Sequence, residues 1–428
     1  MNGELPSDER APLLQAELGN LNHLRTRLNG DQYTSSENPW VRYPAKTWNT
    51  IWATLASNYV NVLLVFVPVG IVLGALDIDP VAIFCVNFLA IVPLAALLSF
   101  ATEELSVKLG QTLGGLMNAT FGNAVELIVS IVALRQGEIR IVQASMLGSI
   151  LSNILLVLGC CFIAGGYNRE EQTFNTTVAS TMSSLMAVAS ASLIIPATLY
   201  AALTQSESST TDNILILSHG TSIILLILYL LYLFFQLKSH AKLFDEESVE
   251  GEEAKEPEVL TPIPAAICLV VVTVLVAVCA EYLVDSIDAI VAKAHISKTF
   301  IGLILLPIVG NAAEHVTACV VAYKDKMDLA IGVAIGSSLQ IALFVTPFLV
   351  ILGWIIGQPM TLHFYMFETV VFFVAVLVVN YLIQDGKSNY LEGAMCLGTY
   401  IIIALAFYVY PDPSNGGGDP GVEPPKLF

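Results

Sequence analysis

Long apolar runs separated by short polar segments occupy the chain between residues 59 and 410. A membrane-spanning helix needs about 20 mostly apolar residues. Eleven runs meet this requirement, with expected bounds at 59–76, 81–100, 115–134, 141–164, 177–203, 215–237, 263–284, 299–322, 328–354, 361–384 and 391–410. The pattern therefore predicts an all-α polytopic membrane protein with 11 transmembrane helices.

The N-terminal part differs, because residues 1–44 are polar and contain no such run. We expect them to form a disordered cytosolic N-terminus. Apolar residues then recur at helical spacing at Trp48, Ile51, Trp52 and Leu55. Since aromatic residues favour the membrane interface, residues 45–76 are predicted to hold an interfacial helix and the first transmembrane helix. A plain N-terminal extension of the first span is the alternative.

Basic residues indicate the orientation of the chain. With the N-terminus in the cytosol, thirteen of the 18 Lys and Arg residues lie in cytosolic segments. The other five are Arg135, Arg140, Lys293, Lys298 and Lys426. The positive-inside rule therefore favours a cytosolic N-terminus and a C-terminus on the opposite side. The Pro- and Gly-rich residues 411–428 are then a disordered tail on that side.

A strongly acidic segment separates the sixth run from the seventh, within a predicted cytosolic loop at residues 239–260. Its acidic residues, which face a lone Lys255, are Asp245, Glu246, Glu247, Glu250, Glu252, Glu253, Glu256 and Glu258. A charge run is usually a solvated linker, and that is one interpretation. The other interpretation is a regulatory segment that attracts cations.

Two segments of the chain repeat one another. Residues 122–153 begin GNAVELIVSIV, residues 310–341 begin GNAAEHVTACV, and they align without a gap at an offset of 310 − 122 = 188. Downstream, Gly148 and Ser149 match Gly336 and Ser337. Chance similarity between apolar helices does not reproduce Asn and Glu at the same spacing.

The two motifs lie in the third and eighth runs, five spans apart. Because five is an odd number, the motif helices cross the membrane in opposite directions. This arrangement predicts an inverted repeat with a substrate site near the midplane. The expected layout is one N-terminal helix followed by two inverted five-helix repeats, at residues 77–238 and 261–410.

Glu126 and Glu314 are expected near the bilayer centre, where an unpaired carboxylate costs several kcal/mol. Neither has an Arg or Lys nearby on its own helix, so the expected partner is a metal cation or a proton. Asn123 and Asn311 precede the glutamates by three residues and share a helix face with them. Such oxygen ligands suit a hard cation such as Ca²⁺. A protonated, hydrogen-bonded structural carboxyl is the alternative.

Other residues are expected to complete this site. Gly122, Gly310 and Pro307 should break the motif helices and free carbonyl oxygens, which is tolerated where the backbone lines a cavity. The expected lining residues are Ala124 and Ala312 within the motifs, with Ser145, Ser149, Ser152, Ser337 and Gln340 in the spans that follow. The alternative for these polar residues is interhelical bonding, with close packing at Gly332 and Gly336.

Three more titratable residues are candidates for a proton or cation path. His315 follows Glu314 directly, Glu103 ends the second run, and Glu281 lies late in the seventh. A histidine near pKa 6.5 can relay protons, and a packed neutral histidine is its alternative. The alternative for both glutamates is an ordinary interfacial carboxylate.

Composition and motifs argue against several classes of function. The net charge of −18 does not suit nucleic acid, because acidic groups repel phosphate. The sequence contains neither G-x-x-x-x-G-K-[ST] nor H-E-x-x-H, so it indicates neither an ATP-driven pump nor an intramembrane zinc protease. We expect neither an enzyme nor a cofactor. A passive channel would share the carboxylates and remains an alternative.

These segments together resemble the cation/proton exchanger family of the Ca²⁺/cation antiporter superfamily, and especially its fungal vacuolar Ca²⁺/H⁺ members. The segments that carry the resemblance are ATEEL, GGLMNATFGNAVELIVSI, VQASMLGSILSN, SKTFIGL, PIVGNAAEHVT, KDKMDLAIGVAIGSSLQIALFVTPF and the acidic loop. The resemblance implies that Glu126, Glu314, Asn123 and Asn311 bind the cation. It also implies that residues 245–258 sense or funnel cytosolic cation.

The activity implied by the resemblance is antiport by alternating access. Ca²⁺, or Mn²⁺, would move from the cytosol into the vacuole in exchange for lumenal protons. The protein would lie in the vacuolar membrane with a lumenal C-terminus, and its partners would be Ca²⁺, protons and the lipid bilayer. Na⁺-coupled Ca²⁺ exchange is the nearest alternative.

Overall fold

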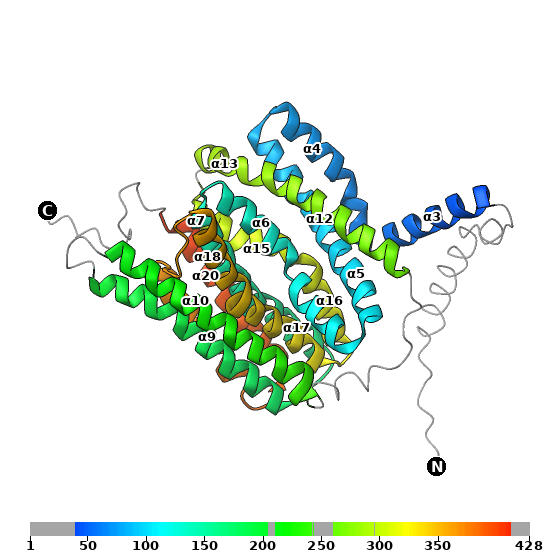
Figure 1. The fold of residues 1–428 in the computed structure, drawn as a ribbon. Helices are drawn as coiled ribbons and strands as arrows, with labels where there is room; N and C mark the ends of the chain where they lie inside the picture. The colour runs from blue at the N-terminus through cyan, green and yellow to red at the C-terminus, as the bar shows by residue number, and fades with distance from the viewer. Residues whose placement is uncertain (1–38, 204–209, 242, 244–259, 295, 412–428) are drawn as a thin grey trace, which may run out of the picture. The chain divides into compact units, whose positions relative to one another are not determined.

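The computed structural model describes residues 39–203, 210–241, 243, 260–294 and 296–411, which are almost entirely helical (Figure 1). Two short strands occur among them, β1 (Gln172–Thr173) and β2 (Lys387–Ser388), and they pair antiparallel with Gln172 opposite Ser388. The predicted acidic residues at 245–258 lie outside the described residues. The same holds for residues 1–38 and 412–428, which make up most of the segments 1–44 and 411–428 where disorder was predicted. Residues 39–44 are helical, so the prediction is wrong for them.

The first of two compact units, Met1–Tyr59, contains helix α3 (Pro39–Leu55). This helix starts earlier than the predicted interfacial helix, and Trp48 and Trp52 are exposed along it. Residues 56–58 are not helical. The alternative of a helical extension of the first span is therefore wrong.

From Tyr59 onward, eight helical stretches of the described chain are long and apolar enough to cross a membrane. They are formed by η1 (Tyr59–Val65) with α4 (Phe66–Leu76), the first part of α5 (Pro80–Phe121), α7 (Ile139–Leu151) with η2 (Ser152–Val157) and α8 (Leu158–Gly166), α9 (Thr176–Leu203), α10 (Thr210–Phe234) with η3 (Phe235–Ser239), α12 (Pro262–Asp285), α17 (Met327–Gln340) with η5 (Ile341–Val345) and α18 (Thr346–Ile356), and α20 (Tyr390–Val409).

Two further apolar stretches are bent helix pairs, which bring the number of candidate spans in the described chain to ten. The end of α5 bends by 47° into α6 (Ala124–Arg135). The second pair, bent by 57°, consists of α14 (Lys298–Phe300), η4 (Ile301–Leu305) and α15 (Leu306–Gly310), followed by α16 (Ala312–Tyr323). Two shorter helices remain, α13 (Ile287–Ala294) and the apolar α19 (Met366–Leu382) of 17 residues.

Helix α5 reverses direction between its two apolar parts. Residues eight positions apart in a straight helix are separated by about 12 Å. A Cβ placed on Gly114 would instead lie 2.3 Å from the carbonyl oxygen of Ser106. The chain therefore folds back here, and glycine is needed because no side chain fits the close approach.

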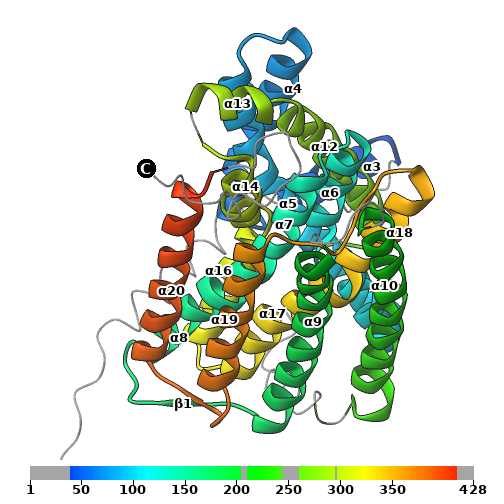
Figure 2. The same cartoon turned by 90° about the vertical axis from the view of Figure 1, so that its left-hand side faces the viewer.

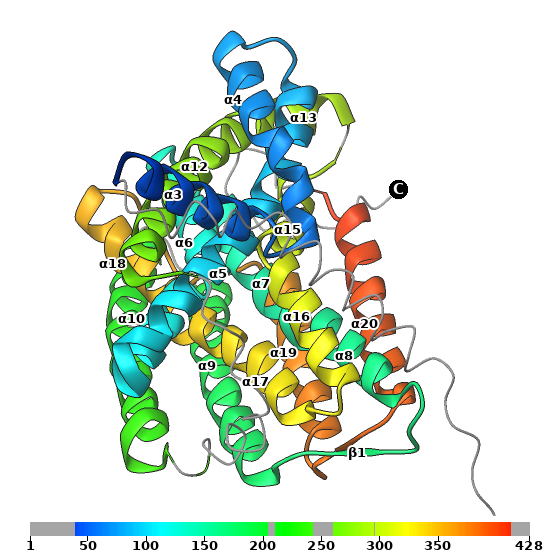
Figure 3. The ribbon, with the colours of Figure 1, turned by 90° about the vertical axis from the view of Figure 1, so that its right-hand side faces the viewer.

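Helices from both halves of the chain pack around the two motifs. α12 lies along both α5 and α6, and α4 packs on α5 (Figure 1). α10 contacts α9 and α18, and α8 contacts α16 and α20 (Figures 2 and 3). α7 crosses η4 so closely that a Cβ on Gly148 would lie 2.1 Å from the carbonyl oxygen of Leu303.

The close packing at Gly332 and Gly336, which formed part of the alternative to site lining, is not found. Among the described residues, no atom of another element lies within 4 Å of a Cβ placed on Gly332. The nearest atom to such a Cβ on Gly336 is Met182 Cε, at 3.9 Å. Gly148, the counterpart of Gly336, is tightly packed, so equivalent glycines of the repeat have unequal surroundings.

Candidate cation site

Each motif helix breaks at its asparagine, next to the glycine from which a break was predicted, whereas the expected break at Pro307 is not found, because Pro307 lies inside α15. α5 ends and α6 begins on either side of Gly122 and Asn123, while α15 and α16 flank Asn311. Asn123 has φ −101° and ψ 30°, and Asn311 has φ −93° and ψ 4°. Both conformations lie near the bridge region of backbone space, where many active-site residues are found.

The breaks place helix ends around the motifs. Glu126 and Glu314 lie in the first turns of α6 and α16, where the partial positive charge of a helix N-terminus stabilises a carboxylate. The ends of α5 and α15 offer carbonyl oxygens that lack partners within their own helices. Broken helices in transporters use such carbonyls to coordinate cations.

Glu126 lies against the motif of the other repeat. Its side chain is buried, and its Oε1 would lie 2.9 Å from a Cβ on Gly310. A cavity of about 20 Å³ lies beside it, enough for a particle the size of one water molecule. The lining residues are Ile91, Val125, Glu126, Val129, Ser145, Ser149, Leu283, Leu306, Val309 and Gly310.

Glu314 is less enclosed than Glu126. Its residue is partly buried, and its Oε2 atom is buried without a hydrogen-bond partner in the described part of the chain. The ion pairs found among the described residues involve other acids. Neither glutamate therefore gains a basic partner from the described fold, in addition to lacking one on its own helix.

Asn123 is held by hydrogen bonds to α17. Its Nδ2 donates to Gln340 Oε1 at 2.7 Å, and its Oδ1 accepts from Ser337 Oγ at 2.8 Å. Asn153, on η2, donates to the same Ser337 Oγ at 3.0 Å. The predicted lining residues Ser337 and Gln340 are thus brought to the first motif.

Asn311 occupies the equivalent position without such a network. The offset of 188 maps Ser337 and Gln340 onto Ser149 and Ser152. Among the described residues, both side-chain atoms of Asn311 and the hydroxyl of Ser149 are buried without a hydrogen-bond partner. Ser152 Oγ instead lies 3.3 Å from His315 Nε2. The second half of the site therefore presents buried polar atoms that nothing in the described fold satisfies.

Both polar helices continue into π-helical segments next to the site. η2 begins at Ser152, and η5 begins at Ile341, the counterpart of Asn153. π-helical turns are rare and frequently occur at functional sites. Their recurrence at equivalent positions accompanies the repeat seen in the sequence.

Of the predicted site residues, Glu126, Ser145, Ser149 and Gly310 line the cavity, and the others do not. Glu103 and Glu281 are exposed, and α12 contributes Leu283 rather than Glu281 to the lining. Ala124 belongs to the hydrophobic core, Ala312 is partly buried, and neither lines the cavity. Position along the sequence therefore did not predict which way the side chains of Glu103, Glu281 and these two alanines point.

Two polar residues near the site were missed by the sequence interpretation. Asn153 aligns with Ile341 and Ser130 aligns with Ala318, so neither has a polar counterpart in the other repeat. Ser130 is buried, and its hydroxyl has no hydrogen-bond partner among the residues that the structure describes. It lies four residues after Glu126 on the same helix face, and this spacing was the available signal.

The atoms near the two motifs that could bind a cation are oxygen atoms. The described residues contain no group of three or more His, Cys, Asp or Glu side chains suited to a metal ion. The polar side-chain atoms left without a hydrogen-bond partner near the motifs, in the described residues, are those of Asn311, Ser149, Ser130 and Glu314 Oε2, and all but the Asn311 nitrogen are oxygen atoms. Such ligands suit Ca²⁺ better than soft metals, which prefer thiolate and imidazole.

Comparison with known proteins assigns the family. Residues 79–238 and 264–409 match the family described as sodium/calcium exchanger protein. The chain belongs to this family. Each matched range contains one Gly-Asn-Ala-x-Glu motif, and the ranges fall within the two predicted repeats.

Relatives within the family share much of the sequence. The chain is 52% identical to the vacuolar calcium ion transporter of Schizosaccharomyces pombe, over 91% of this chain and 94% of that protein. It is 44% identical to vacuolar cation/proton exchanger 2 of Arabidopsis thaliana, over 86% of this chain and 85% of that one. The resemblance to cation/proton exchangers is therefore confirmed.

A solved structure agrees with the fold. Native YfkE is 36% identical to this chain and superposes with a TM-score of 0.71, covering 82% of this chain and all of YfkE (100%). A selenium-substituted structure of YfkE is described as that of a Ca²⁺/H⁺ antiporter protein. The helical membrane fold expected from the apolar runs is shared with this structure.

Proposed function

We propose that this sodium/calcium exchanger family member is a vacuolar Ca²⁺/H⁺ antiporter that moves cytosolic Ca²⁺ into the vacuole in exchange for lumenal protons. One observation carries the proposal: two glutamates of a repeated motif, Glu126 and Glu314, lie at broken helices without a basic partner in the described fold. Relatives named as vacuolar calcium and cation/proton transporters support the choice of ions and of membrane.

Exchange follows from the electrostatics of two carboxylates in one site. Two like charges raise each other's proton affinity, so an empty and doubly ionised site is disfavoured. The glutamates therefore hold either a cation or protons, and binding one releases the other. Access from the two sides alternates as the motif helices move relative to the flanking helices.

The coupling needs more than one proton for a steep gradient. One pH unit supplies about 1.36 kcal/mol per proton. Concentrating Ca²⁺ by about three decades at equal potential costs about 4 kcal/mol. Several protons per Ca²⁺, or a large pH step, are therefore required.

The topology proposed with this function has eleven spans. The seventeen residues of α19 rise about 25 Å, near the lower limit for crossing the hydrocarbon core. With α19 counted, one N-terminal helix precedes two inverted five-helix repeats. Contact between Glu126 and Gly310, from opposite motifs, supports a site shared by the repeats.

The proposed orientation is a cytosolic N-terminus and a lumenal C-terminus. Lys293 pairs with Asp79, and Lys298 pairs with both Glu138 and Asp288. The topology assigns all five of these residues to lumenal segments. The orientation itself rests on the count of basic residues, thirteen in cytosolic segments against five on the other side, because the positive-inside rule counts Lys and Arg and gives acidic residues little weight.

Reconstituted protein tests the coupling ion. Liposomes containing the purified chain receive either a pH gradient, acid inside, or a Na⁺ gradient, and Ca²⁺ uptake is followed. We expect uptake with the pH gradient alone. Uptake that requires the Na⁺ gradient would make the chain a Na⁺-coupled exchanger, and Ca²⁺ flux that moves neither ion would make it a channel.

A further inference from the structure

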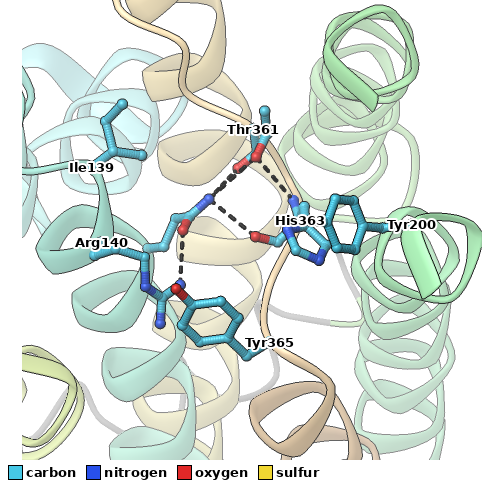
Figure 4. Close-up of a pocket in the computed structure, with 7 residues that line it drawn as sticks. Ile139, Arg140, Tyr200, Thr361, His363 and Tyr365 are labelled. Atoms are coloured by element: carbon cyan, nitrogen blue, oxygen red, sulfur yellow. Dashed lines mark hydrogen bonds between the residues drawn. The ribbon is translucent and has the colours of Figure 1, made fainter. Parts of the chain in front are cut away.

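A second cavity, of about 210 Å³, lies away from the glutamates at the start of α7 (Figure 4). Side chains of Arg140, Gln143, Thr361, His363, Tyr365 and Tyr200 line it. Three of these belong to a non-helical segment, residues 358–365, between α18 and α19. In this segment Met360, Leu362 and Phe364 are buried, so alternate residues face the core and the cavity.

Side chains at the start of α7 form hydrogen bonds and an ion pair with this segment and with the start of α19. Gln143 Nε2 donates to the carbonyl oxygens of Thr361 at 3.0 Å and His363 at 3.1 Å. Arg140 pairs with the fully buried Glu368 of α19, donates to Gln143 Oε1 at 2.9 Å, and stacks 3.8 Å from the Tyr365 ring. We name these contacts the Arg140 latch (Figure 4).

The start of α17 and the turn before it form similar hydrogen bonds to residues 170–175, a non-helical segment that contains β1. Asp328 Oδ1 accepts from the backbone N–H of Asn175 at 2.6 Å. Gln172 Nε2 donates to Asp325 Oδ1 at 2.8 Å and to the Ala322 carbonyl at 3.3 Å. We name these contacts the Asp328 latch.

The two latches occupy equivalent positions in the repeats. The offset of 188 maps Arg140 onto Asp328 and residues 170–175 onto 358–363. The turns before α7 and α17 also match, because Gly137 (φ 81°) and Asp325 (φ 65°) are counterparts with left-handed backbone conformations. Arg140 and Asp328 therefore both connect the start of a span to a non-helical segment, although their side chains differ in chemistry.

Each latch joins one repeat to the other. The Arg140 latch ties the start of the span Ile139–Gly166 to the segment that follows the span Met327–Ile356. The Asp328 latch ties the start of Met327–Ile356 to the segment that follows Ile139–Gly166. The two spans therefore run antiparallel and are fastened at both ends. They carry Ser149 and Ser152 on one side and Ser337 and Gln340 on the other.

We propose that Arg140 and Asp328 are positioning residues that set the register of these two spans, and thereby the geometry of the cation site between them. The proposal rests on the cation site assigned under the proposed function. Loosening one latch lets one polar helix slip against its partner. Ligand oxygens then leave their positions, which weakens cation binding while the carboxylates themselves are unchanged.

Direct Ca²⁺ binding to the purified full-length protein in detergent tests this proposal without any gradient. We expect Arg140→Gln and Asp328→Ala each to weaken the binding of Ca²⁺ about fivefold, the size of effect typical of residues that couple to a site without touching it. Asp328→Asn keeps an oxygen acceptor for Asn175 and should bind nearly as the parent does. Lys387→Gln, which breaks the exposed Lys387–Glu171 pair beside the β ribbon, is the matched control and should bind unchanged.

Thermal unfolding of each variant shows whether it is folded. Arg140→Gln leaves Glu368 buried and unpaired, so a combined Arg140→Gln and Glu368→Gln variant removes both charges and should show the same weakening. Parent-like binding by the folded latch variants would overturn the proposal, and so would equal losses in Asp328→Asn and Asp328→Ala. Glu314→Gln reports separately on the cation site, because it should abolish binding whether or not the latches matter.

Discussion

The two halves of the cation site have the same motif but different surroundings. The Asn123 side chain is hydrogen-bonded to Gln340 and Ser337, whereas the side chains of Asn311 and Ser149 have no hydrogen-bond partner in the described chain. The difference follows partly from one substitution within the repeat. Gln340 has a long amide arm that reaches Asn123, while its counterpart Ser152 is short and contacts His315.

This difference indicates which half of the site is stabilised more by a bound cation or proton. A buried polar group without a partner costs about 1–3 kcal/mol. The Asn123 side chain already has hydrogen-bond partners in the protein, so we expect it to change little when an ion binds. The Asn311 half gains most from a bound cation or proton, and we expect its residues to respond most to the ions that are present.

Equivalent glycines provide the largest predicted contrast. Gly148→Ala would place a Cβ 2.1 Å from a backbone oxygen, whereas Gly336→Ala meets only the end of Met182 at 3.9 Å. Forcing atoms into a packed interior costs about 1–3 kcal/mol, and backbone cannot yield as a side chain does. Gly148→Ala should therefore lose most folded protein and transport, with Gly336→Ala close to the parent. Fluorescence size-exclusion and thermal unfolding check this, and equal tolerance would remove the asymmetry.

The two asparagines should separate stability from binding. Asn123→Ala removes the acceptor of the Ser337 hydroxyl and the donor to Gln340, so it should lower the unfolding temperature as well as Ca²⁺ affinity. Asn311→Ala removes atoms that have no bonds in the described fold, so stability should hold while Ca²⁺ affinity falls. Unfolding curves with and without Ca²⁺ measure both quantities. Identical behaviour of the two variants would contradict the distinction between the halves.

A smaller effect is expected from Gln340→Ala. It removes one interhelical bond, and such bonds in membranes average about 0.6 kcal/mol. The matched change, Ser152→Ala, removes the contact with His315 instead. Gln340→Ala should lower stability slightly and Ser152→Ala should alter the pH dependence of transport. A pH profile of Ser152→Ala that superimposes on the parent's would exclude a role for this contact in proton movement.

The smallest effect is predicted for an exposed pair far from both halves. The ammonium of Lys293 lowers the pKa of the Asp79 carboxyl below its usual range. A carboxyl with a lowered pKa stabilises the fold above its unfolded-state pKa, near 4, and that contribution is lost as pH falls through the folded pKa. Asp79→Asn keeps the oxygen that caps α5 but loses the charge, so it should be slightly less stable than the parent above pH about 4 and should match the parent at lower pH. A change in Ca²⁺ affinity near neutral pH would show an unexpected link to the site.

Much of the fold could be predicted because apolar length alone identifies spans in a membrane. The breaks were predictable in part: the first includes Gly122 and the second directly follows Gly310, but Pro307, which was also expected to break its helix, lies inside α15. The unequal hydrogen bonding of the two halves could not be predicted, because a sequence repeat implies equal surroundings. Likewise Asn153 has an apolar counterpart, so duplication could not reveal its bond to Ser337.

The latches escaped prediction for a related reason. Arg140 and Asp328 are counterparts with opposite charge, so their shared role is visible only from the backbone segments they bind. The prediction that Glu103 and Glu281 belong to an ion path was not supported for a different reason. A carboxylate near a helix end can point in any direction around the helix, and here both are exposed.

The most direct test of the central claim measures Ca²⁺ and proton movement together in acid-loaded liposomes. The parent chain should take up Ca²⁺ while the lumen becomes more alkaline, and Glu126→Gln and Glu314→Gln should each abolish both signals because an amide cannot exchange a proton for a cation. Glu281→Gln, an exposed carboxyl on α12, is the matched control and should retain both. Coupled uptake that persists in Glu126→Gln or Glu314→Gln would contradict the assignment of the exchange site to this pair of glutamates.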